Sequence, residues 1–133
     1  MKKKKNEVEF NGYMIEKCNI QKYNKIQKEK EKTFNITVES SKNKGNDKLY
    51  RVSILIEELY TNRSRIDVEL CGFFEFSNDW EDDDRDYFLN VSAPAILYPY
   101  IRTFISNVTA FDVDETVVLP IINFADLSIR KKD

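Results

Sequence analysis

The chain has 133 residues, of which 41% are hydrophobic and 33% charged, and its formal net charge at pH 7 is -2. This composition is typical of a soluble globular protein, and the length predicts one domain that buries about two thirds of the surface of its unfolded chain. No apolar run approaches the about 18 residues of a transmembrane helix, and the first lysines are not followed by a signal-peptide core. We therefore expect a single cytoplasmic domain over residues 1–133, without membrane insertion.

Several residue types that enzymes use for chemistry are missing or scarce. The chain has no histidine, which excludes catalytic triads, histidine bases and histidine-containing zinc sites. None of its three glycines belongs to a GxGxxG or GxxxxGK(S/T) nucleotide motif. Cys18 and Cys71 fall far apart in predicted strands, and we expect them to be reduced, buried thiols. The chain is therefore predicted not to be an enzyme and to need no metal or other cofactor.

Charge is distributed unevenly along the chain. Residues 1–32 hold ten lysines and five glutamates, but this segment contains no arginine, so we expect no nucleic-acid partner. Residues 79–86 are strongly acidic and favour the start of a helix, where exposed amide groups attract negative charge. They do not form a calcium-binding EF-hand loop, because Asp84 stands where that loop needs glycine and Asn90 where it needs glutamate.

The first half of the chain predicts strands. Apolar and polar residues alternate over residues 32–40, 50–57 and 66–76, which is the period of a half-buried strand. Residues 8–20 follow the same pattern less regularly, and Gly12 indicates a bulge there. Polar connections at 22–32, 41–47 and 61–64 are short enough for an antiparallel sheet of four strands.

The second half predicts helices. We expect a long helix over residues 87–109, bent or restarted near Pro94 and Pro99, because proline removes a main-chain donor. The apolar residues of its second half share one face: Leu97, Ile101, Phe104, Ile105 and Val108. The loop over residues 111–122 is more apolar than a connector needs, and Asn123 can cap a last short helix. The predicted fold class is thus α+β, with helices following a four-stranded antiparallel sheet.

Two motifs carry a resemblance to a known family. The run Ile96-Leu97-Tyr98-Pro99-Tyr100, followed by Arg102 and Ile105-Ser106, resembles the signature helix of the SecB-type protein-export chaperones. Leu119-Pro120-Ile121-Ile122-Asn123-Phe124 is similar to the loop and final helix of that family, and Gly72-Phe73-Phe74 is similar to its fourth strand. The resemblance implies a homotetramer, built as a dimer of dimers, that holds unfolded polypeptides in apolar grooves without ATP and delivers secretory precursors to the ATPase SecA.

Site residues follow from this resemblance and from the excess of apolar residues. We expect Val118 and Leu119 to contact clients and Tyr100 and Thr103 to face another subunit. Asp67 and Glu69 match the acidic residues that family members present to SecA. The full set expected to bind client polypeptides comprises Phe34, Ile36, Phe74, Phe76, Tyr98, Phe111, Val117, Val118, Leu119, Ile121 and Ile122.

Two other functional classes stay open. A SecB-like chaperone could serve one dedicated partner, such as an antitoxin, in place of secretory precursors in general. An enzyme would need a carboxylate pair within residues 79–86, and no base, nucleophile or anion-binding loop accompanies these acids in the sequence.

Overall fold

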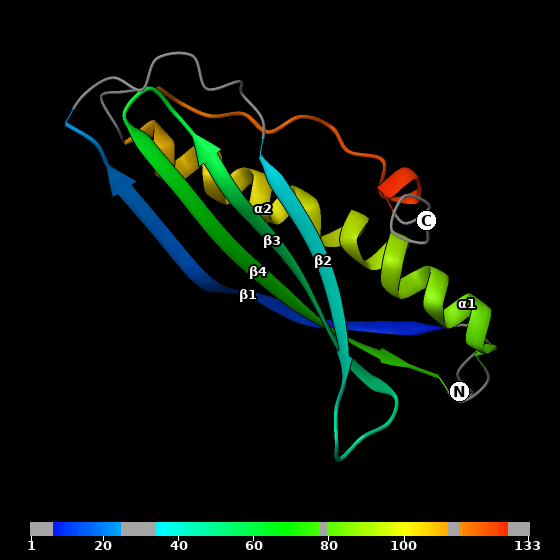
Figure 1. The fold of residues 1–133 in the computed structure, drawn as a ribbon. Coiled ribbons are helices and arrows are strands. Elements are labelled where there is room, and N and C mark those ends of the chain that lie inside the picture. Colours follow the sequence, from blue (N-terminus) through cyan, green and yellow to red (C-terminus); the bar gives the residue numbers. More distant parts are fainter. Residues whose placement is uncertain (1–6, 25–33, 78–79, 112–114, 128–133) are drawn as a thin grey trace.

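The computed structural model describes residues 7–24, 34–77, 80–111 and 115–127 (Figure 1). Four strands precede a continuous run of helical segments, and a short helical turn follows at residues 124–127. The elements are β1 (Val8–Lys22), β2 (Asn35–Lys42), β3 (Leu49–Tyr60), β4 (Ser64–Phe76), α1 (Asp82–Tyr87), the π-helical segment η1 (Phe88–Ser92) and α2 (Ala93–Ala110). The α+β class and the four predicted strands are confirmed, with strand bounds within three residues of those expected.

All three strand pairs are antiparallel, and the sheet order is β1-β4-β3-β2. β2, β3 and β4 follow one another as hairpins, whereas β1 pairs with β4 instead of β2. The first strand and the second strand therefore lie at opposite edges of the sheet. The charged connection between them falls largely on residues 25–33, which lie outside the described residues.

β1 is less regular than the other strands, as its sequence predicts. Its register against β4 shifts between Phe10 and Tyr13, and Gly12 there has a φ of 108°, which a side-chain-bearing residue rarely adopts. The predicted bulge at Gly12 is thus confirmed. A second register shift, between Ile15 and Lys17, was not expected from the sequence.

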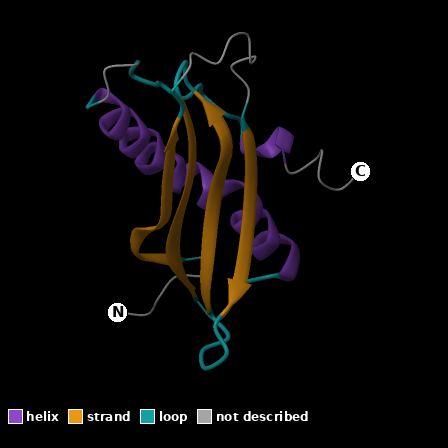
Figure 2. Ribbon diagram, turned by 60° about the vertical axis from the view of Figure 1, so that its left-hand side comes forward, coloured by secondary structure: helices purple, strands orange, loops and turns teal. Residues whose placement is uncertain are grey.

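The helical run covers one face of the sheet, so the molecule has two layers (Figures 1 and 2). The core lies between them and is built from the inward side chains of β3 and β4 and from Leu97, Ile101 and Ile105 of α2. Gly72 permits the close approach of the layers, because a β-carbon there would lie 2.4 Å from a methyl group of Leu97. α2 packs on β3 and β4 but leaves the same face of β1 largely uncovered.

The two cysteines differ in exposure because Cys18 lies on the uncovered face of the edge strand β1, whereas Cys71 lies in a central strand among outer-face side chains such as Glu16. Cys71 in the central strand β4 is buried, as expected. Cys18 in β1 is exposed, so the expectation of a buried thiol is wrong for this residue. The thiols form no disulfide with each other, because both are free.

The helical run begins earlier than predicted and changes form along its length. α1 starts at Asp82, and its first turn contains Asp82, Asp83 and Asp84, which complement the positive end of the helix. The π-helical η1 precedes α2, in which Pro94 stands in the first turn and Pro99 inside. The predicted restart near Pro94 takes the form of this wider turn, which commonly interrupts α-helices.

Candidate functional site

An extended segment follows α2 and runs back along this helix; we call residues 115–123 the strap (Figure 1). Helix side chains fix its main chain. Arg102 Nε donates a hydrogen bond to the Leu119 carbonyl, and Ser106 Oγ donates one to the Val117 carbonyl, both over 2.9 Å. These bonds hold the middle of the strap against one side of α2.

Two further side chains of α2, Thr109 and Tyr98, also form hydrogen bonds with the main chain of the strap. The Val117 amide donates to Thr109 Oγ1 over 2.9 Å, and the Tyr98 hydroxyl donates to the Pro120 carbonyl. Burial raises the pKa of the Tyr98 phenol, although the nearby Arg102 opposes this rise, so the hydroxyl keeps its proton and remains a donor. Four main-chain groups at residues 117, 119 and 120 are thus hydrogen-bonded to α2, which fixes the middle of the strap against the helix.

Sequence reasoning named Tyr98 as a client-binding residue and Arg102 and Ser106 as part of the family motif, but it did not predict that these side chains hold the strap. Tyr98, Arg102, Ser106 and Thr109 are spaced by four, four and three residues, so they share one side of α2. A polar stripe of this kind beside an apolar face could have indicated that a polar main chain lies along the helix.

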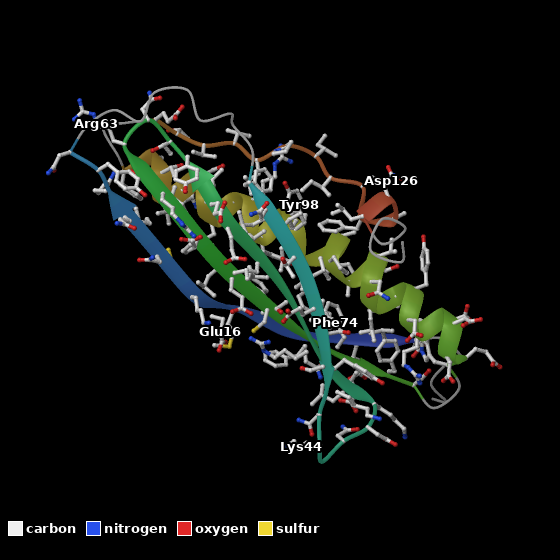
Figure 3. All side chains as sticks on the ribbon, viewed as in Figure 1. Glu16, Lys44, Arg63, Phe74, Tyr98 and Asp126 are labelled. Carbon is white, nitrogen blue, oxygen red and sulfur yellow. The ribbon has the colours of Figure 1, made fainter. Side chains whose placement is uncertain are left out.

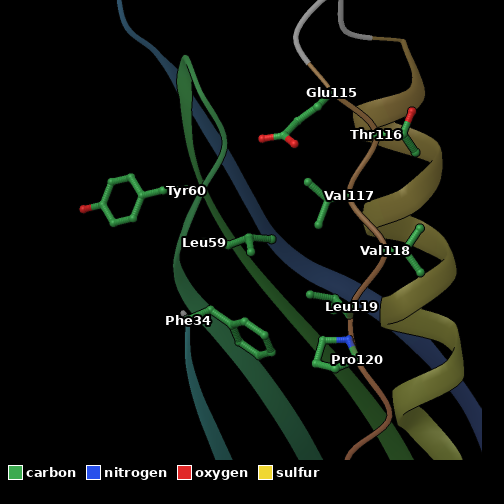
Figure 4. A pocket seen from close by; sticks show the side chains of 9 residues that line it. All are labelled: Phe34, Leu59, Tyr60, Glu115, Thr116, Val117, Val118, Leu119 and Pro120. Carbon is green, nitrogen blue, oxygen red and sulfur yellow. The ribbon is translucent and has the colours of Figure 1, made fainter. Parts of the chain in front are cut away.

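Side chains of the strap alternate between its two faces. Figure 4 shows Val117 and Leu119 pointing toward the sheet, while Thr116 and Val118 point away from it. Leu119 is only 1% exposed, whereas Val118 is 67% and Ile121 is 87% exposed. Over residues 116–119 the strap therefore places one row of side chains in the molecule and another in solvent. The alternation ends at Pro120, because Ile121 has the same parity as Leu119 but is exposed.

A first hollow opens between the strap and the end of β3 (Figure 4). Its volume is about 130 Å³, and Leu59 and Tyr60 form the wall opposite the strap. Glu115 stands at one end, where its carboxylate accepts a hydrogen bond of 3.3 Å from the Asn62 amide.

A second hollow lies beside the start of β2, with a volume of about 290 Å³. Ile36, Ile122 and Leu127 line it with apolar side chains, and Asp126 lines it from the last helical turn (Figure 3). The side chain of Asn123 caps that turn, because Asn123 Oδ1 accepts the Ala125 amide over 3.0 Å, which confirms the predicted cap.

Phe34 and Pro120 line both hollows, which makes them neighbours along one apolar depression. We call the two hollows together the groove. Its walls come from β2, β3 and the strap, so residues separated by more than eighty positions in sequence meet there.

Four residues of the expected client-binding set are buried in the core: Phe74, Phe76, Tyr98 and Leu119, of which Leu119 also lines the first hollow. Phe74 is fully buried beneath the helical layer, and Phe76 packs edge-on against Trp80 and Phe88. The expectation that these side chains contribute exposed apolar surface is wrong, because the helical segments and the strap cover them. Figure 3 shows Phe74 within the sheet, far from Asp126.

The remaining seven residues of that set are accessible. Phe34, Ile36, Val117 and Ile122 are half-buried and line the groove, as does the exposed Val118. Phe111 and Ile121 are also exposed but line neither hollow. Their role in client binding remains a prediction, and the groove with the outer face of the strap is where five of them gather.

The two acids expected to dock SecA lie on the other face of the sheet and are both paired with arginines. Asp67 accepts from Arg65 Nε at 3.1 Å and from the Glu58 amide at 3.0 Å. Partial burial disfavours the charged carboxyl, but these hydrogen bonds outweigh burial and hold the pKa of Asp67 below its ordinary value. Glu69 Oε2 lies 3.7 Å from Arg51 Nη2, so the carboxylates of both Asp67 and Glu69 form ion pairs with arginines.

Comparison with known proteins adds independent findings. The model of the family described as preprotein translocase subunit SecB matches residues 14–133. A relative, the uncharacterized protein MJ0357 of Methanocaldococcus jannaschii, is 40% identical over 62 residues, which is 47% of this chain. The chain spans only 39% of the length of that relative. A membrane-spanning helix would need a longer apolar stretch than any helix in the described residues provides.

Solved structures show the same fold. The SecB-like chaperone Rv1957 of Mycobacterium tuberculosis, solved with a ChAD peptide from the antitoxin HigA1, aligns with a TM-score of 0.65 at 14% identity. That alignment covers 86% of this chain and 90% of the chaperone. A protein of unknown function from Streptococcus agalactiae aligns with a TM-score of 0.50 at 12% identity, covering 87% of this chain and 98% of that protein.

Proposed function

Because the chain belongs to the SecB family, we propose that it is a chaperone that binds unfolded polypeptide segments without a nucleotide. The observation that carries this proposal is the strap, whose middle is hydrogen-bonded to α2 while Val118 and Ile121 remain in solvent beside an apolar groove. Exposed apolar surface around a rigid support is typical of a site that binds other polypeptides. Each large apolar side chain that loses water on binding contributes about 1.5–3 kcal/mol before ordering costs.

A polypeptide is the favoured ligand because the groove offers apolar contact and little directed chemistry. Its two carboxylates, Glu115 and Asp126, line different hollows and do not form a pair. Among the described residues, no group of three His, Cys, Asp or Glu side chains could hold a metal ion. The likeness to a chaperone solved with an antitoxin peptide supports the same class of ligand.

Two kinds of client fit this proposal. The family description favours secretory precursors and delivery to the translocase, in which SecA would be the receiving partner. The SecB-like chaperone bound to an antitoxin peptide favours one dedicated client. Since Asp67 and Glu69 are paired with arginines, docking to SecA needs acids other than these two or a rearrangement of their ion pairs.

We also propose that the chain assembles into the homotetramer that the resemblance implies. The face of β1 that α2 leaves uncovered carries Phe10, Tyr13 and Ile20, all more than a third exposed. Tyr13 stacks on Tyr100 of α2 with ring centroids 4.0 Å apart, which extends this apolar surface onto the helix. A second copy of the chain would remove the surface from water.

The groove and the exposed face of the strap beside it are tested together by binding of a permanently unfolded protein, such as reduced and carboxymethylated lactalbumin, followed by fluorescence anisotropy. Val118→Ser combined with Ile121→Ser should weaken binding about tenfold or more, because two apolar contacts of about 1.5 kcal/mol or more are lost. Tyr87→Ser is the matched control, since Tyr87 is 60% exposed but lies on α1, outside the groove. Equal affinity of the double variant and the control variant would contradict the proposed site.

A further inference from the structure

The last part of β3 is irregular, and this irregularity decides which way Leu59 points. The register between β3 and β4 shifts between Ile56 and Leu59, where two residues of β3 lie opposite Asp67 alone. Beyond this bulge Leu59 pairs with the core residue Ile66, so its side chain lies on the helix face of the sheet. Without the extra residue, Leu59 would lie opposite Arg65 and would point to the other face.

The first hollow owes part of its apolar wall to this bulge. The side chain of Leu59 is only 6% exposed and lines the hollow, and Figure 4 shows it pointing toward the strap. A regular strand would pair Glu58 with Ile66 and place its carboxylate on the helix face in place of the Leu59 side chain. The bulge therefore keeps a charged group out of the groove and an apolar group in it.

The bulge requires an unfavourable backbone conformation at Glu58. Its φ is 56°, and in the part of the chain that the structure describes it is the one residue other than glycine with a positive φ. A residue with a side chain stays in this left-handed conformation only where its surroundings hold it there. The Glu58 amide donates a hydrogen bond of 3.0 Å to Asp67 Oδ1. Arg65 donates to both carboxylate oxygens of Asp67, at 3.1 and 3.2 Å, and thereby fixes their orientation.

We propose that Asp67 is a positioning residue of the client groove, because it holds the bulge at Glu58 and so keeps Leu59 in the wall of the first hollow. This inference rests on the proposed function and adds to it a residue that acts on clients from a distance. Asp67 lies on the outer face of the sheet, opposite the helical layer, and its effect reaches the groove through the main chain of β3.

A rescue experiment separates this role from a direct contact with the client. Asp67→Ala removes the acceptor and should weaken binding of carboxymethylated lactalbumin about fivefold or more, because an apolar contact leaves the groove. Glu58→Gly removes the cost of the left-handed conformation, so the double variant should bind within about twofold of the wild-type chain. Undiminished binding by Asp67→Ala, or a loss that Glu58→Gly does not restore, overturns the proposal.

Glu69→Ala is the matched control for the loss of an acid. Glu69 lies on the same face of β4 as Asp67, but it pairs with Leu55 in the regular part of β3. Its partner Arg51 also lies 3.6 Å from Glu16 and so keeps an ion pair in this variant. Binding should stay within about twofold of the wild-type value, as is usual for a change at a site that positions nothing. A loss as large as that of Asp67→Ala would mean that the charge of the outer face, and not the bulge, controls binding.

Methyl contacts measured by NMR report the position of Leu59 without any client. We expect contacts between Leu59 and the strap residues that line the same hollow, Val117 and Leu119, in the wild-type chain and in the double variant. Asp67→Ala should lose them, and their persistence in that variant overturns the positioning role. If the wild-type chain binds no lactalbumin, the proposed function is wrong, and these contacts still decide whether Asp67 positions Leu59.

The double variant also decides the case in which Asp67→Ala alone does not fold. A double variant that folds and binds lactalbumin then supports the role of Asp67, because only the conformation of residue 58 differs between the two variants. A double variant that remains unfolded overturns it.

Discussion

Val118 and Leu119 are neighbours in sequence but lie on opposite faces of the strap. An extended backbone directs successive side chains to opposite sides, so Leu119 enters the core while Val118 faces solvent. Residues 117–122 are all apolar, so the sequence does not show which of their side chains point inward. This is why the sequence predicted a client contact for both residues.

The two positions should respond differently to the same substitution. Leu119→Ser should lower the free energy of unfolding by more than about 2 kcal/mol, because it leaves a cavity and buries a hydroxyl. Val118→Ser should change it by no more than about 0.5 kcal/mol, as is usual at exposed positions. Urea unfolding followed by fluorescence of Trp80, the single tryptophan, measures both values. Similar losses in the two variants would mean that the strap does not lie as described.

Asp67 supports the sheet locally and should make stability depend on pH. Glu58 has a φ of 56° at the irregularity in β3, and its amide donates to Asp67. Because the pKa of Asp67 is lowered in the folded chain, its contribution to stability is present above its unfolded pKa, about 3.8, and is lost as pH falls through the folded value. We expect the urea midpoint of the wild-type chain to fall more steeply below about pH 4 than that of Asp67→Asn. Parallel pH profiles would contradict this role.

At the scale of elements, the strap and α2 act as one unit. The helix holds the strap through side-chain hydrogen bonds to its main chain, so the exposed face of the strap needs no partner of its own to stay in place. The position of the groove depends on this arrangement, since the strap forms one wall of both hollows.

Removing these hydrogen bonds should loosen the strap without unfolding the helix. The double variant Tyr98→Phe with Ser106→Ala removes two donors, each contributing about 0.5–1.5 kcal/mol. Hydrogen exchange over residues 115–123 should therefore become about tenfold faster or more, while exchange in the middle of α2 stays slow. Thr103→Ala, at an exposed position of the same helix, is the control and should leave the strap unchanged. Unchanged exchange over the strap in the double variant would show that packing alone holds it.

Elements whose apolar residues follow one regular repeat were predictable from the sequence. β4, for example, alternates on either side of its three consecutive buried residues 70–72, so its bounds and its helix-facing side follow from the pattern. The sheet order did not follow, because the pairing of β1 with β4 depends on contacts between residues more than forty positions apart. The groove was predicted only in part: its apolar content is visible in residues 111–122, but the inward turn of Leu119 and the cover over Phe74 depend on tertiary packing.

At the scale of the whole molecule, the uncovered face of β1 is the surface that a further copy of the chain would bury. Phe10, Tyr13 and Tyr100 form a contiguous aromatic group there, with Phe10 also stacked on the buried Phe74. The sequence-based expectation that Tyr100 meets another subunit agrees with its place at this border, and its contact with a second copy remains a prediction.

A charge in this group should oppose assembly. Tyr13→Glu places a carboxylate on a surface that self-association would remove from water, so the light-scattering mass should fall toward that of one chain, 15.8 kDa. Tyr87→Glu introduces the same charge at another exposed tyrosine and should not change the mass. A wild-type chain that is already monomeric at micromolar concentration would contradict the proposed tetramer.

The central claim is that the chain binds polypeptides because they are unfolded and needs no nucleotide to do so. The most direct measurement is isothermal titration of one protein in two states, native lactalbumin and its reduced, carboxymethylated form, into the full chain without ATP. The account predicts that the unfolded form binds with a dissociation constant of about a micromolar or lower and that the native form binds at least about a hundredfold more weakly, because only the unfolded chain exposes apolar segments and main-chain groups. Equal binding of the two forms, or no binding of the unfolded form, would contradict it.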